Sequence, residues 1–183
     1  GLAMRNPATG TNDDLRPFYA IGQDDPPFAP VIQRLYGYHQ VKFSLLPLEN
    51  AVWAILSQRN MMSLSEKMRQ AMVERCGSSL QVEGVVYRSF PEAAQLADVP
   101  VDELAAVIHH GPKAESILDA ARAFASMDEA FLREADYEDV YAWLRQIRGI
   151  GDWSASFVLL RSLGRMEHFP RGEKRILQAA SRV

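Results

Sequence analysis

Residues 147–155 read Ile-Arg-Gly-Ile-Gly-Asp-Trp-Ser-Ala. This stretch joins two segments with the apolar pattern of helices, 137–147 and 152–163. Only residues 148–151 remain between them to reverse the chain. Gly149 and Gly151 can both adopt positive φ, and because they carry no Cβ they let backbone N–H groups approach an anion closely. The stretch therefore predicts two helices folded back on each other around a tight turn.

The turn also has the features of a phosphate site. We expect Ile150, between the glycines, to plug the turn into the core, and Arg148 to supply a nearby charge. The second helix begins at Asp152, so its free N–H groups and the positive end of its dipole face the same region. Taken alone, two glycines between helices fit a plain helical corner equally well.

Most of the remaining sequence predicts a mainly α fold. Ser63 with Glu66 three residues later has a capping-box pattern, and Gly77 stands where that helix should stop. Residues 80–90 are rich in β-formers around a glycine and predict a small β-hairpin. Helices are expected at 48–61, from Ser63 to Gly77, and at 91–96, 101–109, 113–124, 137–147, 152–163 and from about Glu173 onward.

The 183 residues, 48% apolar and 23% charged, suffice for one core or two small lobes. No apolar run reaches the roughly 18 residues needed to span a bilayer, and nothing at the start resembles a signal peptide. We therefore expect a protein of the cytoplasm with no membrane partner. Residues 1–23 are interpreted as a tag remnant and a flexible N-terminus, and 24–183 as the folded domain, whose C-terminal end can be incomplete.

The sequence predicts no cofactor held by side chains. Cys76 is the only cysteine, so this chain builds neither a disulfide framework nor a four-cysteine iron–sulfur cluster. His109 and His110 precede a Gly-Pro pair without metal-ligand spacing, which favours a helix-end turn.

Charge is distributed unevenly along the chain. The formal net charge is −3, yet residues 141–183 hold eight basic and three acidic residues, a local charge of +5 that leaves −8 for the remainder. A local basic surface on an acidic body is typical of a protein that touches phosphates over a short footprint.

Several segments together carry a family resemblance over roughly residues 24–182. They are the hairpin at 147–155, PLENAVWAILSQ at 47–58, KAESIL at 113–118, RSLGR at 161–165 and the Phe169-Pro170 pair. The chain resembles the helix-hairpin-helix (HhH-GPD) base-excision DNA glycosylases, and within them the alkylation-repair branch, 3-methyladenine DNA glycosylase II. The resemblance implies two helical lobes with a helix-hairpin-helix, a monomer that binds double-stranded DNA, and hairpin carbonyls that can hold a sodium or potassium ion.

The resemblance also implies a catalytic residue. The family places an essential aspartate shortly after the Phe-Pro pair, and the matching residue here is Glu173. A carboxylate there can stabilise the oxocarbenium-like sugar and orient the attacking water. Bifunctional members carry a Schiff-base lysine where this chain has Trp153, so a monofunctional enzyme is expected. Lys113 and Lys174 are interpreted as surface or phosphate-contact residues.

Two further sets of residues are candidates by position. Trp153 and Phe157, one helical turn apart, match the base pocket of the alkylation branch, although ordinary core packing explains them equally well. Gln58 and Arg59 end the first helix of the family core, where a side chain is inserted into the duplex; the alternative is an exposed polar helix end. Other aromatic residues, namely Trp53, Trp143, Tyr36 and Tyr38, are assigned to the core.

The expected function is hydrolysis of the N-glycosidic bond of a damaged, alkylated purine flipped out of duplex DNA. Three alternatives stay open: the same fold acting on another lesion, a non-catalytic helix-hairpin-helix DNA-binding protein, and a helical protein-interaction domain.

Overall fold

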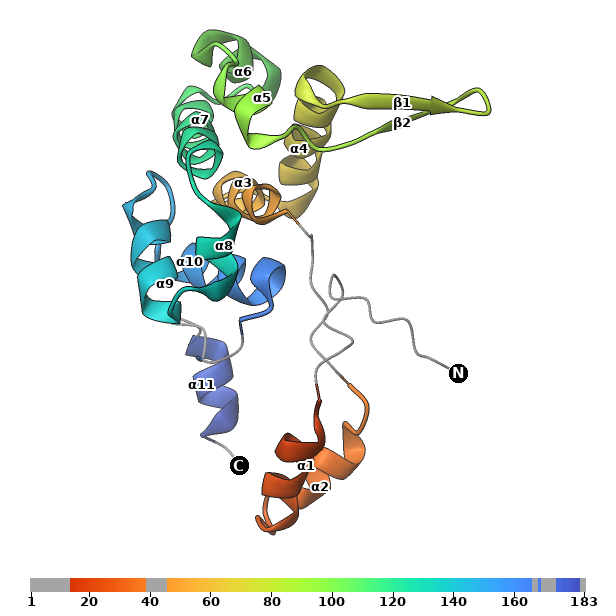
Figure 1. Ribbon diagram of the computed structural model, residues 1–183, viewed down its shortest axis with the longest axis vertical. Coiled ribbons are helices and arrows are strands. Elements are labelled where there is room, and N and C mark those ends of the chain that lie inside the picture. Colours follow the sequence, from red (N-terminus) through yellow and green to blue (C-terminus); the bar gives the residue numbers. More distant parts are fainter. Residues whose placement is uncertain (1–13, 39–45, 166–167, 169–173, 182–183) are drawn as a thin grey trace.

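The computed structural model describes residues 14–38, 46–165, 168 and 174–181. The mainly α fold and the small β-hairpin are both confirmed (Figure 1). The helices are α1 (Arg16–Gln23), α2 (Ala29–Arg34), α3 (Pro47–Ser57), α4 (Met62–Cys76), α5 (Ala93–Ala97), α6 (Val101–Ile108), α7 (Gly111–Ala125), α8 (Glu129–Glu134), α9 (Tyr137–Gln146), α10 (Asp152–Val158) and α11 (Lys174–Ala180), with a π-helical turn η1 (Leu159–Leu163) after α10 and strands β1 (Ser79–Val82) and β2 (Val85–Arg88).

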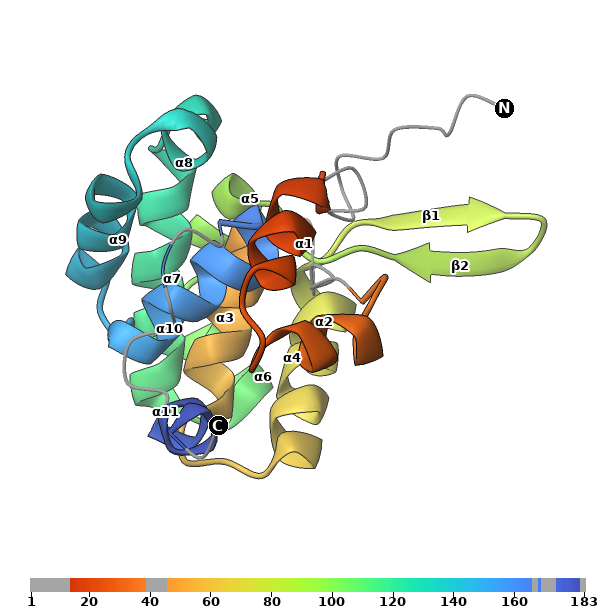
Figure 2. The ribbon, with the colours of Figure 1, turned by 90° about the horizontal axis from the view of Figure 1, so that it is seen from below.

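Helix α3 runs through the middle of the protein, as Figure 2 shows from below. Pro47 occupies its first turn, where a missing N–H costs nothing, and Glu49 complements the helix dipole. From Asn50 to Leu56 every residue is buried, because α4, α7, α10 and η1 surround the helix. Helices α4 to α7 form one lobe and α8 to α10 the other, with α3 between them (Figure 1).

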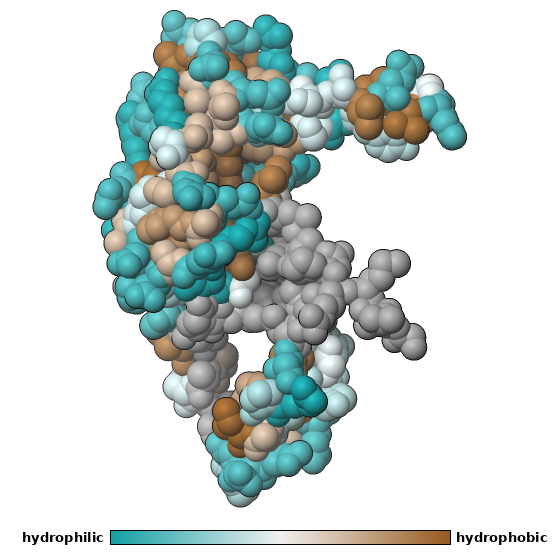
Figure 3. All heavy atoms as spheres, in the orientation of Figure 1, coloured by the Kyte–Doolittle hydropathy of each residue, from teal (hydrophilic) through white to brown (hydrophobic). Residues whose placement is uncertain are grey.

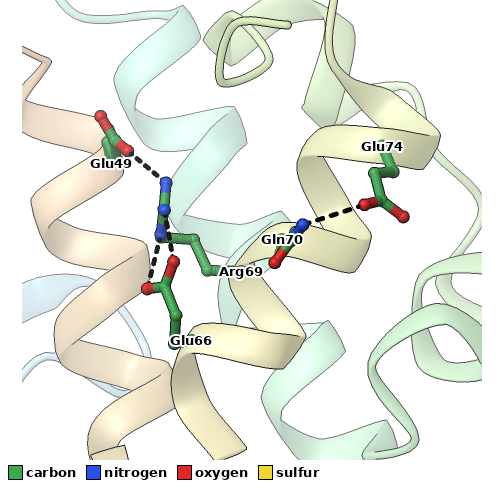
Figure 4. A network of polar contacts seen from close by, with 5 residues as sticks. All are labelled: Glu49, Glu66, Arg69, Gln70 and Glu74. Atoms are coloured by element: carbon green, nitrogen blue, oxygen red, sulfur yellow. Dashed lines mark hydrogen bonds and ion pairs between the residues drawn. The ribbon is translucent and has the colours of Figure 1, made fainter. Parts of the chain in front are cut away.

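The start of α4 differs from the sequence prediction. The helix begins at Met62 and its N-cap, Met61, makes no side-chain cap, so the capping box expected at Ser63 does not form. Glu66 instead bonds Arg69 on the next turn at 2.6 Å, and Arg69 also reaches Glu49 of α3 at 3.1 Å (Figure 4). The carboxylate of Glu66 that a capping box needs is therefore paired with Arg69. The same arginine links α4 to α3 through Glu49. Gly77 ends the helix as expected.

The β-hairpin extends away from the body (Figure 1), and its strands pair antiparallel with Val82 opposite Val85. Every residue of both strands is exposed, and apolar side chains gather on it in Figure 3. The exposed apolar residues are Leu80, Val82, Val85, Val86 and Tyr87.

Two short helices precede α3, and neither is expected from the apolar pattern. Helix α1 falls within residues 1–23, the segment expected to be flexible, and it packs against α2. Tyr36 stacks on Tyr19 of α1 with ring centroids 4.6 Å apart. The assignment of Tyr36 and Tyr38 to the core is wrong, since both are exposed. An aromatic residue type does not by itself show whether the side chain points into the core. Here Tyr36 packs on Tyr19 of the local α1–α2 pair.

The other two aromatic residues assigned to the core do pack there. Trp53 is buried in α3. Trp143 of α9 is half-buried and meets Phe124 edge-on at a centroid distance of 5.0 Å.

Candidate functional site

The predicted hairpin is present, and its two glycines have different roles. Helix α9 ends at Gln146 and α10 begins at Asp152. Gly149 has φ +84°, which favours glycine, and a Cβ there would lie in a tight contact of 3.0 Å with the Cβ of Ser116. Gly151 instead has φ −91° in open surroundings, so it does not use the positive φ that glycine permits. It serves as the N-cap residue of α10.

Ile150 is buried with 3% of its surface exposed, which confirms the predicted plug. Two side chains from other elements fix the turn around it. Gln58, just after α3, donates from Nε2 to the Gly149 carbonyl at 2.7 Å. Arg148 pairs with Glu115 of α7 at 2.6 Å. Both contacts hold the turn against the α3–α7 side of the protein.

The two wedge candidates therefore differ in their surroundings. The side-chain amide of Gln58 is directed to the hairpin. Arg59 is exposed, and its backbone takes the left-handed region with φ +56°. Such a conformation is costly for a residue with a Cβ and persists only where neighbouring contacts impose it.

Lys113 stabilises this loop conformation through hydrogen bonds to its backbone. Its Nζ donates to the carbonyls of Leu56 at 2.5 Å and Gln58 at 2.9 Å, on either side of the C-terminus of α3. Only 9% of Lys113 is exposed, and burial lowers the pKa of its ammonium group. Its interpretation as a surface or phosphate-contact residue is wrong. The helical period could have shown this, because Lys113 shares a face with buried Ile117 and Ala120.

The Trp153 and Phe157 rings stack with centroids 5.1 Å apart and planes 15° from parallel. Trp153 is 43% exposed and Phe157 half-buried, whereas Ser154, Ala155 and Val158 of the same helix are buried. Helix α10 thus turns small residues inward and presents two flat rings outward. Trp153 is therefore too exposed to be an ordinary core residue.

Three residues around the turn form a network that sequence reasoning missed. Arg145 donates from Nη1 to the carbonyl of Ile150 at 2.9 Å, and its Nε lies 2.8 Å from Oδ1 of Asp152. The hydroxyl of Tyr141 donates to the same oxygen at 2.7 Å. In the sequence, Arg145 and Tyr141 lie one helical turn apart, a spacing that could have suggested a shared partner.

His109 and His110 lie at helix ends, and two arginines of the predicted basic surface form ion pairs. His109 ends α6 with φ +54°, and His110 caps α7 by accepting the Lys113 backbone N–H, so the helix-end interpretation is confirmed. Among residues 14–38, 46–165, 168 and 174–181, no three His, Cys, Asp or Glu side chains gather to hold a metal ion. Arg145 and Arg148 both form ion pairs, which reduces the free positive charge expected near the hairpin.

Comparison with known proteins identifies this architecture. Residues 52–183 match the family model of the HhH-GPD superfamily of base excision DNA repair proteins. The chain belongs to this superfamily. The hairpin between α9 and α10 is the element from which the HhH-GPD superfamily takes the first part of its name, and the resemblance inferred from the motifs is confirmed.

Relatives of this HhH-GPD chain include a curated DNA-3-methyladenine glycosylase of Bacillus subtilis (strain 168). It is 30% identical over 161 residues, which are 87% of this chain and 53% of the relative. The structure of MBOgg1 in complex with a low-affinity DNA ligand matches with a TM-score of 0.76 and 25% identity, over 95% of this chain and 61% of the other. The 3-methyladenine DNA glycosylase from Archaeoglobus fulgidus matches with a TM-score of 0.71 and 26% identity, over 93% and 57%. The chain thus spans little more than half the length of these relatives.

One predicted site residue, Glu173, lies near the end of the HhH-GPD match. Glu173 is outside the described residues, as is the side chain of Lys174. The last expected helix is present as α11, which begins immediately after Glu173. In the described part of the chain, none of the helices has the length and apolarity to span a membrane.

Proposed function

We propose that this HhH-GPD chain is a monofunctional DNA glycosylase that removes alkylated purines from duplex DNA. The observation that carries the proposal is the stacked pair of Trp153 and Phe157, half-open to solvent at the start of α10. A glycosylase must hold an extruded base against flat surfaces. A methylated purine is positively charged, so the indole face attracts it by a cation–π contact. The 3-methyladenine glycosylases among the relatives support this lesion class.

The hairpin is the proposed phosphate anchor, formed by Arg148, Gly149, Ile150 and Gly151. The first-turn N–H groups of α10 have no intrahelical partners, and the positive end of the helix dipole adds to their attraction for an anion. Gly151 is the N-cap of α10, and a Cβ there would meet no atom within 4 Å, so the helix N-terminus is not crowded at this residue. Release of Arg148 from Glu115 would add a mobile charge at the same place, since both side chains are partly exposed.

Arg59 is the proposed wedge that fills the gap left by the flipped base. It is exposed, whereas Gln58 is engaged with the hairpin, and Lys113 holds the loop that presents it. A guanidinium in that gap can hydrogen-bond the widowed base. Gln58 then links the loop of the proposed wedge to the proposed phosphate anchor through its hydrogen bond to Gly149.

Glu173 is the proposed catalytic carboxylate, and α11 starts at the next residue. It would stabilise the positive charge that develops on the sugar and orient or deprotonate the attacking water. Because position 153 holds an indole rather than an amine, no Schiff base forms there, and the abasic strand is left intact.

The test is base release from duplex DNA that contains methylated purines, followed by alkali to break the strand at abasic sites. We expect free base from the wild-type protein and strand breaks only after alkali. Glu173→Gln should abolish both signals, whereas Glu134→Gln, on the exposed face of α8, should leave them unchanged. Strand breaks without alkali would contradict the monofunctional assignment. DNA binding without base release would favour the non-catalytic alternative. Release of base from other damaged duplexes in a panel would instead indicate a different lesion.

A further inference from the structure

The carbonyls of the hairpin turn already have hydrogen-bond donors. The family resemblance implies that such carbonyls can hold a monovalent cation. Here the Ile147 carbonyl accepts the Ile150 N–H at 3.0 Å, and the Gly149 carbonyl accepts the Gln58 amide at 2.7 Å. The Ile150 carbonyl accepts the guanidinium of Arg145 at 2.9 Å. Three carbonyls of the turn are thus engaged, one of them by a group that carries a positive charge.

Arg145 is held in this position from two sides. Its Nε pairs with Asp152 at 2.8 Å, and Tyr141 fixes the same carboxylate oxygen at 2.7 Å. The guanidinium therefore bridges the last turn of α9, the turn carbonyl and the first residue of α10. Its positive charge, at the C-terminus of α9, complements the dipole of that helix.

We propose that Arg145 takes the place of the monovalent cation at this hairpin. The donor set does not fit an additional ion, because a cation on the Ile150 carbonyl would stand beside the guanidinium and be repelled by it. The consequence is that the hairpin of this chain keeps its shape and its affinity for DNA whatever monovalent cation is present. The affinity part rests on the proposed DNA-binding function, whereas the shape part does not.

The experiment compares potassium, sodium and tetramethylammonium chloride at equal concentration. Tetramethylammonium screens charge but is too large, and lacks the coordination chemistry, to sit among backbone carbonyls. For the wild-type protein we expect dissociation constants for duplex DNA that agree within about twofold in the three salts. Arg145→Met should bind about tenfold more weakly in tetramethylammonium, as loss of a charged hydrogen-bond donor implies. Potassium should restore part of that affinity by binding at the vacated Ile150 carbonyl.

Arg133→Met is the matched control, because it removes an arginine whose ion-pair partner, Glu129, lies on the same helix, α8. It should bind DNA like the wild type in all three salts. The thermal unfolding midpoint, measured without DNA, should show the same pattern: no cation preference in the wild type and stabilisation of Arg145→Met by potassium. A wild-type protein that binds DNA or resists heat better in potassium overturns the inference, as does an Arg145→Met variant that is equally weakened in all salts. Failure of the wild type to bind DNA at all contradicts the proposed function, while the unfolding midpoints still test Arg145.

Discussion

Gln58 and Gly149, 91 positions apart in the sequence, are joined by a hydrogen bond of 2.7 Å from the side-chain amide to the backbone carbonyl. The bond connects the loop after α3, which presents Arg59, with the hairpin that precedes α10. The two elements that the proposed function places on the same stretch of duplex are thereby held at a fixed spacing. Positioning of this kind affects rate strongly, since a displacement of about 1 Å can cost on the order of 100-fold.

Replacing Gln58 by leucine removes this connection. We expect a loss of about 0.5–1.5 kcal/mol in the free energy of unfolding, the usual net value of one hydrogen bond, and a larger proportional loss of base release. Urea denaturation and single-turnover base release measure the two quantities. The control is Gln70→Leu on α4, whose amide bonds Glu74 on the same helix (Figure 4). Equal effects of both variants on base release would contradict a role for Gln58 in spacing.

The two hairpin glycines should respond differently to alanine. Gly149→Ala combines positive φ with a Cβ 3.0 Å from Ser116, so we expect it to lower the free energy of unfolding by about 1–2 kcal/mol or more. Gly151→Ala has ordinary φ and open space, so stability should change by less than about 0.5 kcal/mol. Its methyl group would instead stand where a phosphate approaches, and DNA affinity should fall. Circular dichroism melts and fluorescence anisotropy separate these outcomes; a destabilised Gly151→Ala would refute the assignment.

Lys113→Met tests the buried ammonium group. The variant keeps most of the side-chain volume but leaves the carbonyls of Leu56 and Gln58 without that donor, although Ser65 still donates to Leu56 at 3.1 Å. Asn60 also donates to Leu56 at 3.0 Å, so the Gln58 carbonyl is the acceptor affected most. One lost hydrogen bond of a charged donor is worth about 1.5–3 kcal/mol, and we expect a loss of about that size by urea denaturation. Lys67→Met on an exposed position of α4 is the control and should be close to neutral.

The lowered pKa of Lys113 also predicts a pH dependence. The unfolded lysine keeps its proton up to its ordinary pKa of about 10.4, whereas the folded one releases it at lower pH. In that alkaline window the unfolded state binds more protons, so this group makes the free energy of unfolding rise with pH. The wild-type value minus that of Lys113→Met should therefore increase between the folded pKa and about pH 10.4. A difference that is flat or falls over this window would show that the pKa is not lowered.

Trp153 should contribute to base release more than to stability. Because the indole is 43% exposed, Trp153→Ala should change the unfolding midpoint only slightly, while loss of stacking and cation–π contact should reduce kcat/KM by roughly tenfold or more. Trp153→Phe should recover part of that activity. The loss should be larger for a cationic methylated purine than for a neutral damaged base on the same duplex. Tyr87→Ala, an exposed aromatic on β2, is the control.

Local signals located most elements from α3 onward, and the turn, but not the short helices α1, α2 and α8. The 3.6-residue apolar period located α3, α4, α6, α7, α9 and α10, and the β-formers around Gly84 located the β-hairpin. Gly149 and Ile150 could be assigned from the shortness of the connection, since a chain that reverses so quickly needs a left-handed residue and a buried anchor. The family motifs followed from the same segments.

Contacts between distant segments decided the rest. Arg69 ties α4 to α3 through Glu49, and Lys113 is buried because two carbonyls at the end of α3 accept its hydrogen bonds. Gly151 keeps an ordinary φ because Gly149 alone completes the reversal. A sequence read residue by residue contains propensities and periods, which act over a few positions. The partner of a charge or a carbonyl is set by which helices meet in space, and that depends on the packing of the whole chain.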